Sequence, residues 1–500
     1  MKPGSRALPL AAALMAAGAA HAAAQDYRLR LDSRVQSVAF RGVVLDSIPA
    51  SQVVVGANGG LETPDGRAVT CIASAGYCMF YLPGDRLSSA PLVTSGDLTA
   101  WGFGLPGLSV RANARWTTDL TGDDHFPGTQ PSVELLEAYA EYAGASLTGR
   151  LGRQHDAGRL GWIGFDGAAL TARPLNGRLE LTGYGGWGLA RAADVPIASP
   201  SLNPLGEFQL PERQVTAGAR AAWRGTRVEL QAEYRREVDP SSDQFVSERA
   251  ALAAVLRPVE RFTITGGADY DLAQGWWGTA DLTLRYDGSR VNADAGVRRY
   301  RPFFELWTIW GAFSPVGYTA IDGSLAVTPV QRLRLRASGE RYWFDDSGAE
   351  TGLATFENDG WRLSFSATVA PAPSVFVDGG FHEEFGPGAS SRTWDARVSW
   401  QPREHLSVAG FGSALMRPLE LRFDEAHVNA VGVDADYRVS DRLRVALSGA
   451  RYFEDRRRPD PGAFDWNQFR VQARITWLLG TDPDRLRLPP AIRGRRTAAP

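Results

Sequence analysis

The sequence feature that most constrains the fold is an apolar residue at every second position, repeated along most of the chain. Residues 226–238, TRVELQAEYRREV, are typical, because Val228, Leu230, Ala232 and Tyr234 alternate with polar and mostly charged residues. A period of two predicts a β-strand with one apolar and one polar face. From residue 97 onward we identify twenty-one such segments, with no amphipathic helix pattern between them, so the chain is predicted to be all-β.

The connections between these segments alternate in length. Short links such as 176–177, 224–225 and 287–288 alternate with longer ones such as 189–212 and 345–358. Tight turns at one rim and long loops at the other are typical of transmembrane antiparallel β-barrels. A propeller would show a repeated blade motif, and we find none in this sequence.

The residues on the two faces indicate which solvent each face meets. The apolar face is built mainly from small residues and single aromatics, as in 215–223, whereas the other face carries rows such as Arg332, Arg334 and Arg336. Such charges cannot pack into a dry protein core. Hydrocarbon outside and water inside satisfy both faces, and a slip of 226–238 by one residue would cost roughly 5–10 kcal/mol. We therefore expect a transmembrane antiparallel β-barrel of about 20–22 strands, occupying residues 97–480.

The two ends of the chain are expected to lie outside the barrel wall. Residues 1–24 have the basic start, short apolar core and small-residue cleavage site of a signal peptide. Residues 481–500 are rich in Pro and Arg and are expected to form a disordered periplasmic tail. Because an exported protein matures in an oxidising compartment, Cys71 and Cys78 are expected to form a disulfide.

Residues 25–96 leave two arrangements open. An additional strand within 27–42 would bring the count to twenty-two, since both ends of such barrels normally lie in the periplasm. Residues 43–96 would then form a large first outer loop or an inward-folded plug. In the alternative, 25–96 is a small periplasmic β-domain beside a twenty-stranded barrel. The first arrangement is favoured, because a wide barrel usually holds something in its lumen.

Strand parity also assigns the charged residues to a side of the wall. The row of Arg332, Arg334 and Arg336 would favour anions, whereas opposite charges paired along the wall would stiffen the barrel without selecting a solute. The residues expected to line the lumen are Arg227, Glu229, Glu233, Asp281, Arg285, Arg332, Arg334, Arg336, Asp434, Asp436, Arg470 and Arg474.

Three segments end alike, in VRRY, GERY and GARY. In each, one arginine (Arg299, Arg341 or Arg451) falls on the lipid-facing parity. Each lies nine or ten residues past its short turn, which is roughly 25 Å up the barrel. We expect these three arginines to contact phosphates of lipid headgroups. The alternative is that they are strand-end residues that point into solvent or are turned inward by a bulge.

One stretch carries a more local resemblance. Residues 152–170, GRQHDAGRLGWIGFDGAAL, contain GRQ (Gly152, Arg153, Gln154) and FDG (Phe165, Asp166, Gly167). This pattern resembles the strand-loop-strand segment of porin-like and alginate-export-like barrels. Over its mature length the chain resembles Gram-negative outer-membrane barrels of the porin type. Arg153 and Asp166 are then expected to end adjacent antiparallel strands and to pair across the loop.

Two features depart from these barrels. Trp477 is followed by twenty-three residues, so the chain does not end on a terminal aromatic residue. We also find no N-terminal plug of the size that energised transporters carry, which counts against active uptake.

Nothing in the sequence indicates an enzyme, a metal site or a cofactor. The mature histidines, such as His382 beside Glu383 and Glu384, are scattered, and no G-x-S-x-G nucleophile motif occurs. With a formal net charge of −2 there is no electrostatic case for nucleic acid.

The resemblance to porins implies passive diffusion of small hydrophilic solutes through the outer membrane of a Gram-negative bacterium. The alternative is a non-conducting barrel that acts as a scaffold, receptor or anchor for a partner. Other expected partners are outer-membrane lipid, lipopolysaccharide and the barrel-assembly machinery during biogenesis.

Overall fold

The computed structural model describes residues 26–56, 60–71, 76–121, 132–189, 214–239, 244–301, 317–345, 358–386, 389–417, 426–456 and 467–481. Within these residues the helices are two 3-10 turns, Ala50–Gln52 and Leu175–Gly177. Neither is long and apolar enough to cross a membrane. The expected signal peptide and nearly all of the expected tail lie outside the described residues.

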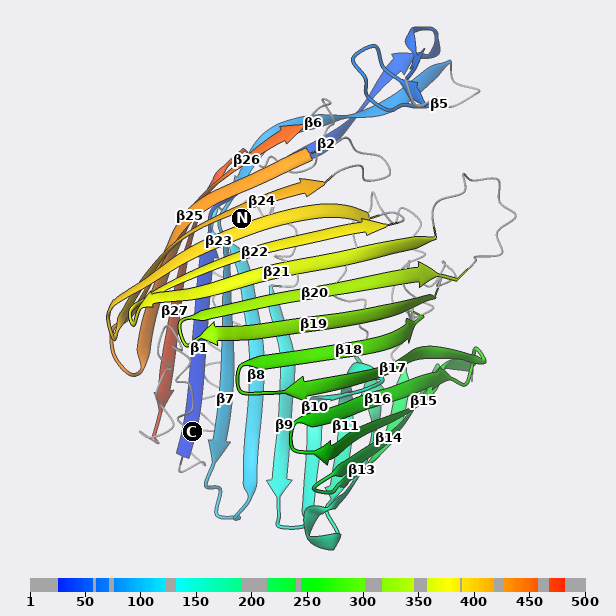
Figure 1. Ribbon diagram of the computed structural model, residues 1–500, viewed down its shortest axis with the longest axis vertical. Coiled ribbons are helices and arrows are strands. Elements are labelled where there is room, and N and C mark those ends of the chain that lie inside the picture. Colours follow the sequence, from blue (N-terminus) through cyan, green and yellow to red (C-terminus); the bar gives the residue numbers. More distant parts are fainter. Residues whose placement is uncertain are drawn as a thin grey trace, which may run out of the picture.

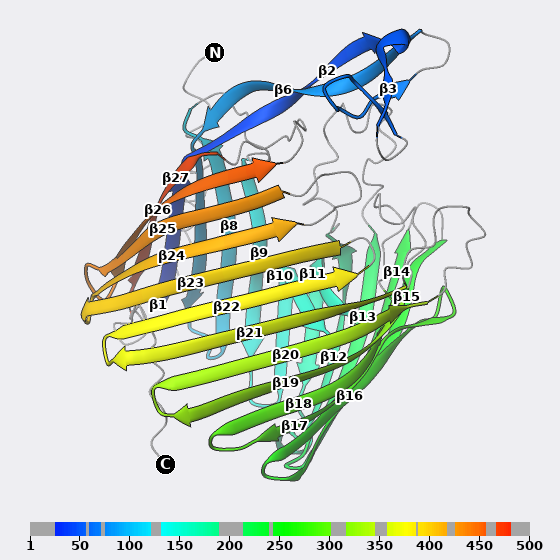
Figure 2. The same ribbon diagram turned by 45° about the horizontal axis from the view of Figure 1, so that its top comes forward.

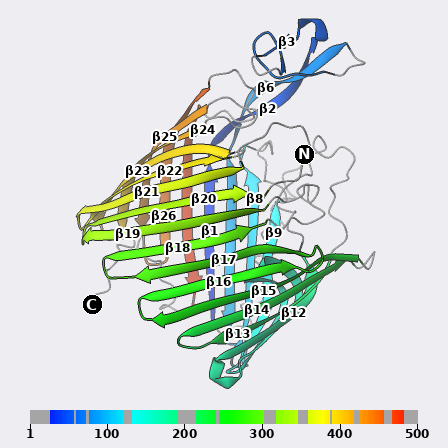
Figure 3. The ribbon, with the colours of Figure 1, turned by 45° about the vertical axis from the view of Figure 1, so that its right-hand side comes forward.

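Twenty-two antiparallel strands form one closed ring (Figures 1 and 3). The first strand closes it, because β1 pairs with β27 on one side and with β7 on the other. The prediction of a transmembrane antiparallel barrel is confirmed, with twenty-two strands. The ring strands are β1 (Asp26–Gln36), β7 (Pro91–Trp101), β8 (Leu108–Asp119), β9 (Val133–Ala143), β10 (Leu147–Gly158), β11 (Gly161–Ala172), β12 (Leu179–Gly188), β13 (Val215–Arg224), β14 (Val228–Asp239), β15 (Gln244–Val259), β16 (Phe262–Asp271), β17 (Trp276–Asp287), β18 (Val291–Tyr300), β19 (Tyr318–Val330), β20 (Leu333–Phe344), β21 (Asp359–Ala372), β22 (Val375–Gly386), β23 (Ala389–Arg403), β24 (Leu406–Arg417), β25 (Ala426–Arg438), β26 (Leu443–Arg456) and β27 (Phe469–Gly480).

Both ends of the ring meet at the rim with the short turns. The backbone N–H of Tyr27, at the start of β1, donates to Thr481 Oγ1 at 3.1 Å, just past the end of β27. The long connections leave the opposite rim (Figure 1). Since barrel termini normally lie in the periplasm, the rim with long connections is the outer one.

The strand register places large apolar side chains on the outside of the ring. Leu230 lies opposite Ala254, and Leu252 lies opposite Ala268, so these four residues share one face. Leu252 is 66% exposed although it sits in the middle of a strand. Large apolar residues exposed in this way on strand after strand form a band that hydrocarbon must cover. The apolar parity predicted from the sequence is therefore the outer face.

The described residues between 37 and 90 form an arm that projects from the outer rim between β1 and β7 (Figure 2). Its long ribbon pairs β2 (Val38–Pro49) with β6 (Tyr77–Ser89). The shorter strands at its tip are β3 (Val54–Val55), β4 (Leu61–Glu62) and β5 (Thr70–Cys71). Cys71 lies opposite Cys78 across β5 and β6, and the two form a disulfide, as predicted.

Side chains at the outer rim fix the base of this arm. The carboxylate of Asp119, at the end of β8, accepts the backbone N–H of Ala90 at 3.0 Å and the Ser89 hydroxyl. On the other side, Gln468 Oε1 accepts the backbone N–H of Ala39 at 2.9 Å. The arm is therefore joined to the barrel by hydrogen bonds on both of its strands.

Candidate functional site

The inner wall of the ring is lined by ion pairs that run from strand to strand. Glu340 on β20 accepts from Arg298 on β18 and from Arg362 on β21, and Arg362 also donates to Glu384 on β22. At the closing seam, Arg474 Nε donates to Asp32 Oδ1 at 2.8 Å. Guanidinium and carboxylate groups at this density keep the lumen hydrated, since neither can be left in a dry interior.

Most of the residues expected to line the lumen lie on this wall, and most of those have a charged neighbour. Glu229 pairs with Arg257, Asp434 with Arg397, and Asp436 with Arg444. Arg470 lies over the ring of Tyr452, and Arg285 pairs with Asp287. Arg334 and Arg336 instead face Thr368 and Ser366 across the β20–β21 ladder.

Two of those residues are placed differently from the expectation. Arg227 and Arg332 lie in the short turns before β14 and β20, at the rim opposite the outer one, and both are exposed. The Arg332 side chain donates to the carbonyl oxygen of Pro371, near the end of β21. The alternating sequence pattern that predicted Arg227 and Arg332 as strand residues starts one or two residues before the first paired residue of each strand.

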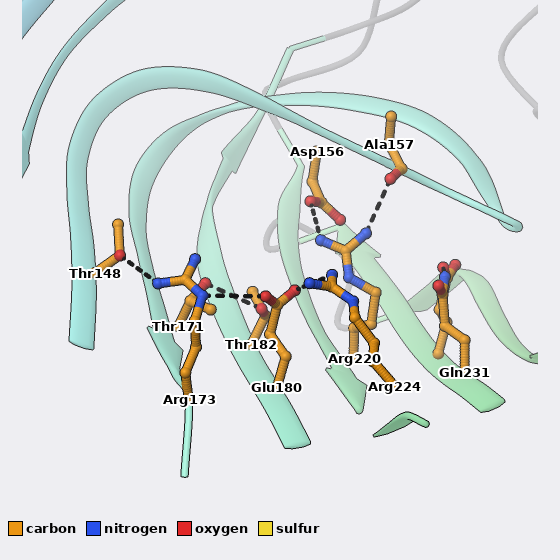
Figure 4. A network of polar contacts seen from close by, with 11 residues as sticks. Thr148, Asp156, Ala157, Thr171, Arg173, Glu180, Thr182, Arg220, Arg224 and Gln231 are labelled. Atoms are coloured by element: carbon orange, nitrogen blue, oxygen red, sulfur yellow. Dashed lines mark hydrogen bonds and ion pairs between the residues drawn. The ribbon is translucent and has the colours of Figure 1, made fainter. Parts of the chain in front are cut away.

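The β10–β11 hairpin leaves the wall and folds over its inner face (Figure 4). β10 pairs with β9 only up to Arg153, and the β11–β12 ladder begins at Phe165. Between these two points, residues 154–164 continue as a hairpin of their own, which turns at Arg159 and Leu160. We call residues 154–164 the inner hairpin. The sequence predicted a loop here, and the structure extends both strands.

Three glycines lie side by side where the inner hairpin begins. Gly152 of β10 pairs with Gly167 of β11, which pairs with Gly186 of β12. Gly152 has φ +128°, and a Cβ on Gly167 would lie 2.1 Å from the carbonyl oxygen of Gly185. Only glycine fits so close an approach of neighbouring backbones. The glycine row therefore permits the bend.

A socket on the inner wall holds the tip of the inner hairpin. The Glu233 carboxylate, on β14, accepts the backbone N–H groups of Arg159 and Leu160 at 3.0 and 3.1 Å. Arg235 and Arg249 both donate to the carbonyl oxygen of Leu160. The turn thus presents both donors and acceptors to charged partners. We call the five wall residues Arg220, Glu233, Arg235, Arg249 and Asp281 the socket.

Two further ion pairs extend this contact along the wall. Arg159 reaches Asp281 on β17, and Arg220 on β13 donates to Asp156 at 2.7 Å and to the Ala157 carbonyl oxygen at 2.9 Å. Figure 4 shows Arg220 rising from the wall to the hairpin above it. Charged groups of four wall strands therefore hold the hairpin, and Glu137 on β9 adds a contact to His155.

Below the hairpin, the same figure shows a second network on the wall (Figure 4). Glu180 accepts from Arg173 and from Arg224 at 3.2 Å each, and Arg173 also donates to Thr148 Oγ1 at 2.8 Å. These hydrogen bonds link β10, β12 and β13 near the rim with the short turns.

The underside of the inner hairpin is buried against the wall. Leu160 and Ile163 are 5% and 3% exposed, and the Phe165 ring stacks on Tyr184 of β12 with centroids 5.2 Å apart. The opposite side of the hairpin carries Trp162, which is 49% exposed. A second layer packed on a sheet adds about 10 Å of thickness, so the hairpin narrows the lumen at this wall.

The three arginines expected at lipid headgroups all have outward register. Arg299 lies opposite Thr319, Arg341 opposite Ile321, and Arg451 opposite Phe469. The Arg299 side chain donates to Asp345 at 2.7 Å, and Arg341 forms an ion pair with Asp359. Two of the three are therefore already paired with carboxylates at the outer ends of β20 and β21.

The acidic pair beside His382 does not form one site. Glu383 has outward register and pairs with Arg392, whereas Glu384 faces the lumen and pairs with Arg362. His382 Nδ1 is 2.8 Å from the Ser364 hydroxyl. Among the described residues, no group of three or more His, Cys, Asp or Glu side chains could hold a metal ion.

Comparisons with known proteins give no family. No family model and no curated protein matches the chain. Similar solved structures include the copper transporter OprC, at 13% identity and TM-score 0.47, covering 90% of this chain and 81% of that one. The siderophore receptor PirA from Acinetobacter baumannii is 9% identical with a TM-score of 0.45, and the match covers 91% of this chain and 80% of that one. OccK3 from Pseudomonas aeruginosa is 11% identical with a TM-score of 0.39, and the match covers 92% of this chain and 97% of that one. Likeness at this level carries no argument about function, so the barrel assignment rests on the strand pairing itself.

Proposed function

We propose that the protein is a channel of the Gram-negative outer membrane that lets small hydrophilic solutes diffuse passively. The observation that carries the proposal is the inner wall, where charged residues line strand after strand inside a closed ring. Such a wall offers hydrogen-bonding partners to water and polar solutes at every height, whereas the apolar outer face meets lipid. The proposed surroundings are outer-membrane lipid and lipopolysaccharide, reached with the help of the barrel-assembly machinery.

The inner hairpin would set the size limit of the channel. A barrel of twenty-two strands encloses a wide lumen, which in such barrels is usually partly filled by other segments of the chain. Here the inner hairpin fills part of the lumen from the side of β13–β17. The solutes would then pass between this hairpin and the ladder of Arg298, Glu340 and Arg362.

The charges on the wall argue for weak ion selectivity. Most of the named arginines contact carboxylates, as do Arg397 with Asp434 and Arg444 with Asp436. The row at Arg334 and Arg336 faces the hydroxyl residues Thr368 and Ser366 across the ladder. A modest preference for anions is therefore expected rather than exclusion of cations.

Liposome swelling tests this function. Full-length protein is refolded into vesicles, and swelling rates are compared for neutral sugars of increasing size. The proposal expects faster swelling than in empty vesicles for small sugars, and a cut-off as the sugar size rises. Swelling no faster than that of empty vesicles, with folded protein verified by heat-modifiable gel mobility, would refute it.

A second candidate is favoured by the arm. A ribbon that projects from the outer rim and carries exposed Tyr81 and Leu45, 57% and 50% exposed, is the kind of surface that a receptor or scaffold presents. The swelling test separates the two functions, since a scaffold needs no conducting lumen.

A further inference from the structure

We propose that the β10–β11 inner hairpin is a hinged gate, which the charged socket holds closed against the inner wall. The inference rests on the proposed function only in naming the movement a gate. The movement itself follows from three features of the hairpin: how it is hinged, how it is paired and how its tip is held.

The hinge is the glycine row. Gly152, Gly167 and Gly186 lie within two rungs of the points where the hairpin leaves its ladders to β9 and β12, and none of the three has a side chain of its own to resist a change of angle. Beyond them, the ladder to β9 stops at Arg153. Past Phe165 the structure gives one backbone hydrogen bond to the β12 side, from the N–H of Leu189, just after β12, to the carbonyl oxygen of Gly164. Residues at the end of an element, including glycines, commonly absorb the dihedral changes of a hinge.

The inner hairpin depends on its docked position for stability. A two-stranded hairpin by itself is marginally stable in water. Residues 154–163 lack ladder partners on β9 and β12 within the described chain, so their order comes from the wall below them. Segments of this kind open locally at lower cost than the ladder they belong to.

The charged side chains of the socket hold the hairpin in its closed position. Glu233 binds the two N–H groups of the turn, Arg235 and Arg249 bind its carbonyl oxygen, and Asp281 binds Arg159. A hydrated lumen offers water and ions as substitutes for each of these partners. Removal of one charge therefore shifts the hairpin toward the open position, whereas buried Leu160 and Ile163 oppose opening.

The test uses one buried cysteine as a reporter. The chain has no free cysteine among its described residues, because Cys71 and Cys78 are joined. Ile163→Cys places a thiol on the face of the hairpin that is buried against the wall, 3% exposed in the wild type. Ser51→Cys, on the exposed turn of the arm, reports that the reagent reaches the protein. Labelling by a maleimide-polyethylene glycol is followed by gel shift on folded full-length protein in vesicles.

Socket variants are compared with a matched ion pair elsewhere in the lumen. Arg159→Ala and Glu233→Gln are expected to raise the labelling rate of the thiol at position 163 by about tenfold or more. Arg397→Ala, which breaks the Arg397–Asp434 pair, is expected to leave that rate unchanged. The double variant Arg159→Asp with Asp281→Arg is expected to restore protection. Heat-modifiable mobility excludes variants that fail to fold.

Two outcomes overturn the gate. One is a thiol at position 163 that labels as fast as Ser51→Cys in the otherwise wild-type chain. The other is a rate that does not change in Arg159→Ala and Glu233→Gln. Single-channel recording of the same variants separates the two proposals. Faster labelling with no current in any variant keeps the hinged movement and removes the channel; current with unchanged labelling keeps the channel and leaves the hairpin a fixed constriction.

Discussion

Arg153 and Asp166 hold one another by two parallel hydrogen bonds at the last rung where β10 is still paired with β9. Arg153 Nε donates to Asp166 Oδ1 at 2.7 Å, and Nη2 donates to Oδ2 at 2.9 Å. The same guanidinium donates to the carbonyl oxygen of Leu135 on β9. Because the pair stands next to the glycine row, it fixes the two strands of the hairpin to each other and to the wall at the point where they bend.

Loss of this pair is expected to destabilise the bend. A bidentate arginine–carboxylate pair that is about one-quarter exposed stabilises by about 1 kcal/mol, so Arg153→Ala is predicted to lower the free energy of unfolding by that amount in urea. Arg285→Ala, which breaks a more exposed pair with Asp287, is the control and should change it by less than about 0.5 kcal/mol. Equal effects of the two substitutions would contradict the special position of Arg153.

The glycine row predicts a steric penalty that depends on position. Gly167→Ala puts a Cβ 2.1 Å from the carbonyl oxygen of Gly185, so the strands must shift, at a cost of about 1–3 kcal/mol. Gly183→Ala, on neighbouring β12, adds a methyl group with nothing within 4 Å and should be tolerated. Heat-modifiable gel mobility across a temperature series measures both. A Gly167 variant as stable as the Gly183 variant would show that the bend does not need glycine.

Because one face of the wall meets lipid and the other meets water, an arginine introduced at two adjacent residues is expected to change the free energy of unfolding by very different amounts. Leu447 has outward register and is 54% exposed, whereas Ser448 faces the lumen opposite Asp434. Leu447→Arg should cost about 2–4 kcal/mol because it carries a guanidinium into hydrocarbon, and Ser448→Arg should cost far less. Unfolding of the refolded protein in lipid vesicles gives both values. If the lumen substitution were the more costly, the assignment of the two faces would be reversed.

The disulfide is expected to act on the arm alone. Cys71 and Cys78 are seven residues apart in sequence and lie at the tip, so the chain-entropy contribution of their bond is about 2 kcal/mol, confined to that tip. A Cys71→Ser and Cys78→Ser variant should keep the folded barrel on gels while limited proteolysis cuts the tip faster. Loss of the folded barrel band in this variant would mean that the arm contributes to assembly of the ring.

We still propose that Arg299, Arg341 and Arg451 contact lipid phosphates at the outer rim. We expect Arg299→Ala, Arg341→Ala and Arg451→Ala together to reduce the lipid that copurifies with the protein and to raise detergent permeability of the outer membrane. Since Arg299 and Arg341 also pair with Asp345 and Asp359, Arg451→Ala should give the largest single effect. Lipid association and permeability unchanged in the triple variant would reject headgroup binding.

The wall of the barrel could be predicted because each of its strands faces two solvents. Hydrocarbon on one side and water on the other impose a period of two, which is why TRVELQAEYRREV predicted β14 and why the count reached twenty-two with a strand near residue 27. Charge pairing at strand ends also pointed to Arg153 and Asp166.

The inner hairpin carried no such pattern. Residues 155–164, HDAGRLGWIG, have a polar wall on one side and the lumen on the other, so no hydrocarbon face imposes alternation. Glu233 was predicted to line the lumen, but its partner Arg159 lies 74 residues away in sequence, and no local rule connects them. The arm occupies the first outer connection, one of the two forms expected for residues 43–96, but no sequence signal predicted its paired β2–β6 ribbon.

The most direct test of the account is single-channel conductance of refolded full-length protein in planar lipid bilayers. The account predicts stable, repeated current steps, because water fills a lumen lined by charged side chains from rim to rim. Protein that is folded by heat-modifiable mobility, inserted into the bilayer and electrically silent would contradict it.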